Sequence, residues 1–171
     1  ENLIAISSNE KTCDQIPGVI KKIPAENHGA LKNILSQVPE ISFRRLPDPE
    51  GDSCSFVCWF LPTAEITAAV VAELKAQSIL AGNFYWYDNN WHYVRKWDHL
   101  KQGITLNALS ERHKAEVMKH ANKEFAASDA IMSRCISTSI SLLWTGEQMK
   151  EKGQKMVTVI KDVLSRSSVA L

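Results

Sequence analysis

The fold of this chain is decided by the stretch CSFVCWFLPT, residues 54–63. Residues 54–61 are almost continuously apolar, a composition typical of a strand that is covered on both faces. The closing Pro-Thr ends the strand, and Thr63 can cap a following helix that carries Glu65 in its first turn. An apolar stripe from Ile66 to Leu74 predicts that this helix packs against a core.

The residues before this strand predict a helix, a short strand and a turn. Pro17-Gly18 indicates a turn, and a helix is expected from Pro24, which suits a first helical turn, through Leu35. A proline at position 39 ends that helix. Residues 41–46 then predict a short strand, and the Pro-Asp-rich stretch 47–52 predicts a turn.

The residues after residue 63 predict two more strands and two more helices. A strand is expected over 79–87, followed by a long irregular segment and a polar helix over 110–127. The stretch 134–141 alternates cleanly between apolar and small polar residues, which predicts a strand. Thr145-x-x-Gln148 is a capping box, and the helix that it starts is expected to end near Leu164.

These elements predict an α+β fold, in which a small, mainly antiparallel sheet has helices on one face. In the strand over 134–141, Ile136 and Ile140 share one face. The opposite face consists of Cys135, Ser137, Ser139 and Ser141. Because these side chains are small and polar, we expect another group to be able to approach this face closely.

Composition excludes several classes of function. The 171 residues carry a net charge of +1, and scattered basic residues give no electrostatic case for a nucleic-acid partner. No apolar run approaches the roughly 20 residues of a membrane span, and no secretory signal pattern opens the chain. The four cysteines lack zinc-type spacing, which favours reduced, mostly buried thiols in a cytoplasmic protein, with Cys58 an inert core residue.

The most unusual segment is YWYDNNWHYVRKWDH, residues 85–99, which holds all three tyrosines and three of the five tryptophans. Rings that alternate with amides and imidazoles suit a surface that stacks on a flat polar ligand and hydrogen-bonds its edges. A protein or domain interface has the same composition, so both interpretations stay open. His92 could hydrogen-bond a ligand or be structural, and Arg134 could bind a carboxylate or be a surface charge.

Motifs for other chemistry are absent from the sequence. It contains no P-loop, no Gly-x-Gly-x-x-Gly and no Gly-x-Ser-x-Gly. His113 and His120 are seven residues apart, too far for one metal ion, and are expected at the surface. We therefore predict no metal site.

The run from about Pro39 to Leu164 resembles the C-terminal small domain of the DegT/DnrJ/EryC1/StrS family of pyridoxal-phosphate sugar aminotransferases. The resemblance lies in the Pro-Glu-Ile-Ser-Phe-Arg strand (39–44), the strand over 55–61, the aromatic run 85–93 and the Trp144-Thr145-x-x-Gln148 helix start. The aromatic run is most similar to the branch that makes an amino sugar acid of bacterial lipopolysaccharide. Residues 1–38 would then be a poorly defined segment and a helix that link to a missing large domain, and residues 39–171 the small domain.

The resemblance implies a role in substrate binding. In this family the large domain carries the Schiff-base lysine, in a Ser-x-x-x-x-Lys context, and the pyridoxal phosphate. That motif is absent here, so no catalytic residue is expected in this chain. The implied substrate contacts are Tyr87, Asn90, Trp91 and His92, with Arg134 as a candidate for a carboxylate.

The parent enzyme implied by this resemblance is a cytoplasmic homodimer that moves an amino group from an amino acid, glutamate by expectation, to a keto-sugar acid. The alternative is a stand-alone module that uses the aromatic segment 85–97 to bind a carbohydrate or a protein.

Overall fold

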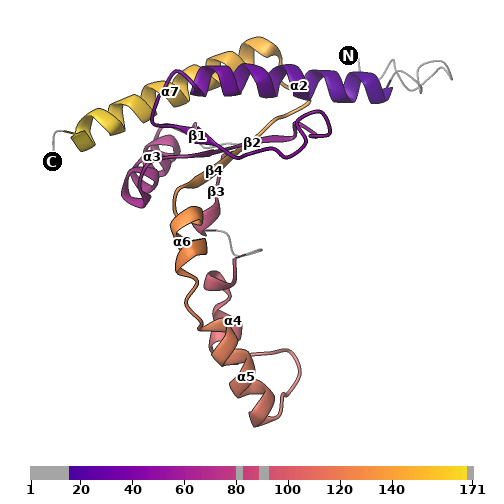
Figure 1. Cartoon of the computed structure of the whole chain (residues 1–171), viewed down its shortest axis with the longest axis vertical. Helices are drawn as coiled ribbons and strands as arrows, with labels where there is room; N and C mark the ends of the chain where they lie inside the picture. The colour runs from indigo at the N-terminus through magenta and orange to yellow at the C-terminus, as the bar shows by residue number, and fades with distance from the viewer. Residues whose placement is uncertain (1–15, 80–82, 89–92, 169–171) are drawn as a thin grey trace.

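The computed structural model describes residues 16–79, 83–88 and 93–168 (Figure 1). The helices in this part are α2 (Ile16–Leu35), α3 (Ala64–Ala76), α4 (Asp98–Lys101), α5 (Glu111–Ala121), α6 (Ala126–Met132) and α7 (Gly146–Ser168). The strands are β1 (Ser42–Phe43), β2 (Phe56–Phe60), β3 (Asn83–Tyr85) and β4 (Cys135–Ser139). Two single 3-10 turns, η2 (Trp86–Asp88) and η3 (Val94–Lys96), follow β3. The elements confirm the predicted α+β class.

The four strands form one antiparallel sheet in the order β1-β2-β4-β3. In its centre Cys58 lies opposite Ser137, and Trp59 lies opposite Ile136. Because side chains alternate across a strand, Val57, Trp59 and Ile136 point to one face and Cys58 and Ser137 to the other. The sheet therefore has two chemically different faces.

One face carries the helices. Helices α2 and α7 lie side by side across the sheet, and α3 packs against α7 (Figure 1). Each of the three helices contributes fully buried side chains that lie in one cluster with Trp59 and Ile136 of the sheet. They are Leu31 and Leu35 of α2, Val70 and Leu74 of α3, and Met156 and Ile160 of α7. Burial of this apolar surface is the main force that holds the two layers together.

A polar link crosses this core. The indole N–H of Trp59 donates to the hydroxyl of Thr138 at 3.0 Å, and that hydroxyl donates to the side-chain oxygen of Asn83. Thr138 is fully buried. The link joins β2, β4 and β3, so it helps to fix their register as well as satisfying buried polar groups.

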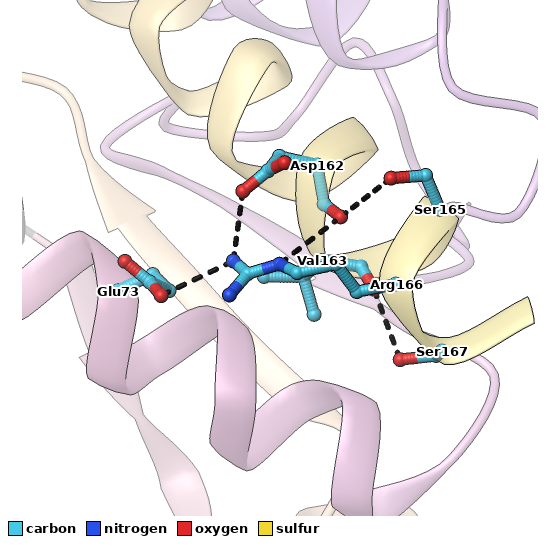
Figure 2. A network of polar contacts seen from close by, with 6 residues as sticks. All are labelled: Glu73, Asp162, Val163, Ser165, Arg166 and Ser167. Carbon is cyan, nitrogen blue, oxygen red and sulfur yellow. Dashed lines mark hydrogen bonds and ion pairs between the residues drawn. The ribbon is translucent and has the colours of Figure 1, made fainter. Parts of the chain in front are cut away.

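On the outer surface, Arg166 of α7 connects two helices. Its guanidinium lies 3.1 Å from Glu73 of α3 and 2.8 Å from Asp162 of α7 (Figure 2). All three side chains are solvent-accessible, so the pair of bridges adds little to stability and mainly orients the end of α7.

Helices α4, α5 and α6 form an arm that extends away from the sheet (Figure 1). The short helix α4 contacts α5, and Asn122 donates to the carbonyl of Lys101 at 3.1 Å. Between Leu74 and Ile136, none of the residues that the structure describes (75–79, 83–88 and 93–135) is a buried member of the main core cluster. The arm is thus held by its own contacts and by the segment that joins it to β3 and β4.

Several predicted boundaries were wrong. Helix α2 begins at Ile16, so Pro24 lies inside it, and the turn predicted at Pro17-Gly18 is helical instead. A proline in the second turn or later removes one hydrogen bond, but a helix that packs against α7 can tolerate that loss. The helix predicted over 110–127 is two helices, α5 and α6, and α7 continues past Leu164 to Ser168.

The prediction that β2 is covered on both faces was also wrong. Val57 and Trp59 are buried, but Phe56, Cys58 and Phe60 are half-buried. An apolar composition alone does not distinguish a strand buried on both faces from one whose second face is apolar and partly open.

Candidate functional site

The sheet face opposite the helices is one candidate surface. We call it the open sheet face, and it consists of Phe56, Cys58, Phe60, Phe84, Cys135, Ser137 and Ser139. Phe84 is 38% exposed and Ser139 is exposed, whereas Cys135 and Ser137 are buried between their neighbours. The small side chains of β4 lie between larger rings, and the expectation that another group approaches them closely stays a prediction.

Two side chains border the open sheet face. The guanidinium of Arg44 lies 5.2 Å from the ring centroid of Phe56. The backbone N–H of Arg44 donates to the carbonyl of Cys58. The indole of Trp86 packs edge-on against Phe84, with ring centroids 5.3 Å apart. This border places one cation and one N–H donor beside an otherwise apolar and small-residue surface.

Cys58 and Cys135 interact on this face. A side-chain hydrogen bond from Cys135 lowers the pKa of the Cys58 thiol to about 7, against the opposing effect of burial, and the nearby Arg44 charge lowers that pKa further. The same contact and burial raise the pKa of Cys135. The two thiols therefore titrate as a pair, in which the first proton is lost more easily than from an ordinary thiol and the second with more difficulty.

The expectation that Cys58 lies in the core was wrong, whereas its expected lack of reactivity stays a prediction. Its strand is apolar, which suggested full burial, but the register places its side chain on the open sheet face. Sequence carried a usable signal, because Cys58 and Phe60 alternate with the buried Val57 and Trp59.

The aromatic segment begins at the end of β3. The hydroxyl of Tyr85 donates to the carbonyl of Ser133 at 3.0 Å, and burial, followed by the charge of Asp88, raises the pKa of Tyr85 to about 12. Tyr85 also packs against the core cluster. This residue anchors the segment to the start of β4 and stays a neutral hydrogen-bond donor at physiological pH.

Tyr87 is surrounded by cations. The guanidinium of Arg95 lies 5.1 Å from its ring centroid and the ammonium of Lys96 lies 5.8 Å from it. Arg95 in turn pairs with Asp129 of α6 at 2.7 Å, and Lys96 pairs with Asp88 at 3.4 Å. The ring of Tyr87 is thus partly covered from within the chain, while these charges remain able to hydrogen-bond an external polar group.

The predicted site residues are only partly described. Asn90, Trp91 and His92 lie outside the described residues, so their role as substrate contacts stays a prediction. Tyr87 lies in η2 as stated above. Arg134 donates from Nε to the carbonyl of Ala130 at 3.0 Å and from Nη1 to that of Pro62 at 3.5 Å. These bonds tie β4 to the end of α6 and to the turn before α3.

The described residues do not fit a pyridoxal-phosphate site. Such a site needs a lysine amine in a dry pocket and a carboxylate beside the pyridine nitrogen. No lysine of the described part is fully buried. Lys152 has its pKa lowered by burial, but its ammonium lies 4.6 Å from the ring centroid of Trp144, next to the start of α7 and not on the open sheet face.

Metal chemistry and membrane insertion find no support either. Within residues 16–79, 83–88 and 93–168, no group of three or more His, Cys, Asp or Glu side chains could hold a metal ion. His113 and His120 are exposed, as expected. None of the described helices is both long and apolar enough to cross a bilayer.

A comparison with protein-family models found no match to this chain.

Proposed function

We propose that this chain is the C-terminal small domain of a pyridoxal-phosphate sugar aminotransferase of the DegT/DnrJ/EryC1/StrS type. In this proposal residues 1–38 link to a large domain, which binds the cofactor, and residues 39–171 form a wall of the substrate cleft. In this proposal the isolated chain is inactive, because its sequence lacks the Schiff-base lysine motif and its described residues do not fit a site for the cofactor.

The observation that carries the proposal is the one-sided sheet. Helices cover one face, and the open sheet face combines half-buried phenylalanines with small residues. A partly apolar face of this kind on a small domain is typical of a surface that packs against another domain or encloses a ligand. The aromatic segment starts at the edge of the same sheet, where β3 ends.

The chain's own residues would bind and orient the substrate. Tyr87, Asn90, Trp91 and His92 are the proposed contacts to the sugar, whose hydroxyl groups suit amide and imidazole hydrogen bonds beside aromatic rings. Arg134 is the proposed contact to a carboxylate, through guanidinium N–H groups other than the two that already donate to carbonyls.

The remaining features of the proposal concern the parent protein. We propose that it is a cytoplasmic homodimer, and that it transfers the amino group of glutamate to a keto-sugar acid that becomes part of lipopolysaccharide. The described helices are compatible with a location outside the membrane, since none could span it.

The test uses the protein purified from its source together with anything covalently or tightly attached to it. The proposal expects a mass larger than that of this chain and the visible absorbance of bound pyridoxal phosphate, with a shift of that absorbance when glutamate is added. A colourless protein with the mass of this chain alone would contradict the proposal.

One observation favours an interaction module instead. Leu106, in the connection between α4 and α5, is fully exposed, and Leu143 is 77% exposed. Together with the aromatic segment, whose Tyr, Trp and Arg residues are the types enriched at protein interfaces, these exposed leucines support a contact with another protein. Trp91→Ala would separate the candidates: it should weaken keto-sugar binding in the aminotransferase, sugar binding in a stand-alone carbohydrate module, and complex formation in a protein-interaction module.

A further inference from the structure

Cys58 and Cys135 lie on neighbouring strands of the open sheet face. Phe60 is opposite Cys135 and Cys58 is opposite Ser137, so the two cysteines are diagonal neighbours across β2 and β4. The Cys135 side chain is also the first cause that lowers the pKa of the Cys58 thiol. No disulfide joins them, since both are free thiols. The register therefore places a half-buried thiol, Cys58, beside a buried one, Cys135, on the same face of the sheet.

The surroundings of Cys58 stabilise a negative charge on its sulfur. The neighbouring Cys135 side chain is the main cause that lowers the pKa of Cys58, and the charge of Arg44, whose backbone N–H donates to the Cys58 carbonyl, lowers it further. A thiol with a pKa near 7 is about half ionised at neutral pH, whereas an unperturbed thiol with a pKa of about 8.5 is only a few per cent ionised. Since the thiolate is the reactive form, Cys58 is the expected nucleophile of the pair.

A third observation concerns Trp86. Its indole N–H is buried and makes no well-formed hydrogen bond within the described residues, although it is near enough to Cys58 to favour the thiolate. A buried donor without an acceptor carries a free-energy cost. An oxygen atom bonded to the Cys58 sulfur would give this N–H an acceptor on the same side of the sheet, where Trp86 packs against Phe84.

We propose that Cys58 and Cys135 form a redox-active dithiol that hydrogen peroxide oxidises to a cross-strand disulfide. The Cys58 thiolate attacks one peroxide oxygen, the O–O bond breaks, and hydroxide leaves and is protonated to water, which gives a sulfenic acid on Cys58. The Cys135 sulfur then attacks the Cys58 sulfur, the S–O bond breaks, and a second water leaves with the Cys135 proton. Overall, two thiols lose two electrons and two protons, and the peroxide is reduced to two waters.

The product is expected to be easily reduced. Diagonal residues on paired strands have Cα atoms about 7–8 Å apart, at or beyond the upper limit of ordinary disulfides, so β2 and β4 must shift slightly to close the bond. Strained disulfides have more oxidising potentials and are typical of reversible, regulatory sites. Because the bond crosses the open sheet face, it changes the surface that this face presents to any partner.

The first test is peroxide oxidation of the full chain with Cys13→Ser and Cys54→Ser, which leaves only the pair. We expect one equivalent of peroxide to remove two hydrogen atoms from the intact mass, and a non-reducing digest to contain one peptide pair joined through residues 58 and 135. A thiol reductant should reverse both changes. Oxygen addition at Cys58 without the crosslink, or no reaction, would overturn the proposal.

Two single variants separate the roles of the thiols. With Cys135→Ser, the sulfenic acid should persist and react with dimedone at residue 58, whereas Cys58→Ser should leave Cys135 unreacted. Alkylation of the unaltered pair provides a measurement that needs no core substitution. Its rate at Cys58 should rise with a midpoint near pH 7, and Arg44→Gln should move the midpoint upward. A midpoint near that of an ordinary thiol would contradict the assignment of Cys58 as nucleophile.

Discussion

At the scale of single residues, Thr138 is the polar centre of the core. It accepts from Trp59 and donates to Asn83, and it is fully buried. Thr138→Val keeps the shape of the side chain but leaves the Trp59 indole N–H and the Asn83 side-chain oxygen without this hydrogen-bond partner, so it should lower the free energy of unfolding by about 1–3 kcal/mol. Urea denaturation followed by circular dichroism measures this change.

The matched control is Ser139→Val on the same strand. This side chain is exposed on the open sheet face, so a change of no more than about 0.5 kcal/mol is expected. If Thr138→Val proved as stable as the wild type, the hydrogen-bonded link would contribute nothing to folding.

His28 gives the fold a pH dependence. Burial is the main cause that lowers its pKa below 6.5, and the charges of Lys32 and Arg44 act in the same direction, whereas Asp52, 4.0 Å away, opposes them. Since the unfolded chain then binds the proton more readily than the folded chain, stability falls as the pH is lowered through the range below about 6.5, and His28 adds no pH dependence well above it.

His28→Gln removes this proton-binding group. Unfolding measured at intervals between about pH 7.5 and 5.5 should show a smaller loss of stability in the variant than in the wild type. His120→Gln, at an exposed position of α5, is the control for the histidine-to-glutamine change itself. An unchanged slope in His28→Gln would assign the pH dependence to other groups.

At the scale of elements, two glycines in helices have opposite surroundings. A Cβ on Gly29 of α2 would meet no atom within 4 Å, whereas one on Gly153 of α7 would lie 3.2 Å from Ile34 and from Leu31. Alanine is favoured over glycine in a helix by about 1 kcal/mol, so Gly29→Ala should stabilise the protein by up to that amount. Gly153→Val should destabilise it by about 1–3 kcal/mol because it forces α2 and α7 apart.

Thermal unfolding of Gly29→Ala and Gly153→Ala compares the two surroundings directly. Gly153→Ala combines the helix preference with a tight contact, so its stability should lie below that of Gly29→Ala. Equal stabilisation by both changes would show that α2 and α7 adjust freely at their contact.

The elements also show how far sequence patterns reach. Strand β4 and the start of α7 were predicted because alternation and the Thr145–Gln148 capping box are local signals, and the reciprocal bonds of that box are present at 2.9 and 3.2 Å. The start of α2 was missed because Pro17 and Gly18 usually indicate a turn. There the helix depends on residues distant in sequence, which a local pattern does not contain.

The candidate site depended even more on pairing between distant residues. The small polar face of β4 was predicted, but its contact with Cys58 required the register between β2 and β4, 77 residues apart in the case of Cys58 and Cys135. The anchoring of Tyr85 by Ser133 and the covering of Tyr87 by Arg95 are likewise contacts that no spacing rule predicts. Composition identified the aromatic segment, and only the fold identified its partners.

At the scale of the whole molecule, the arm and the sheet core should be energetically separate. The core cluster contains no buried residue from the arm, and α4 and α5 pack mainly on each other (Figure 1). Replacing residues 98–122 by a short Gly-Ser linker should therefore change the free energy of unfolding of the core by less than about 1 kcal/mol. Urea unfolding of both proteins, followed by circular dichroism, measures this difference.

Met156→Ala provides the internal reference, because this fully buried side chain of α7 lies in the core cluster. Met156→Ala should lower the free energy of unfolding by about 2–5 kcal/mol in the full chain. The loss should be the same after residues 98–122 are replaced, since the effects of distant independent changes add. A smaller cost in the shortened chain, or failure of that chain to fold, would mean that the arm stabilises the sheet. Equal costs would mean that the arm is not needed for the stability of the sheet. Its exposed surface, which includes Leu106, would then be available to bind another molecule.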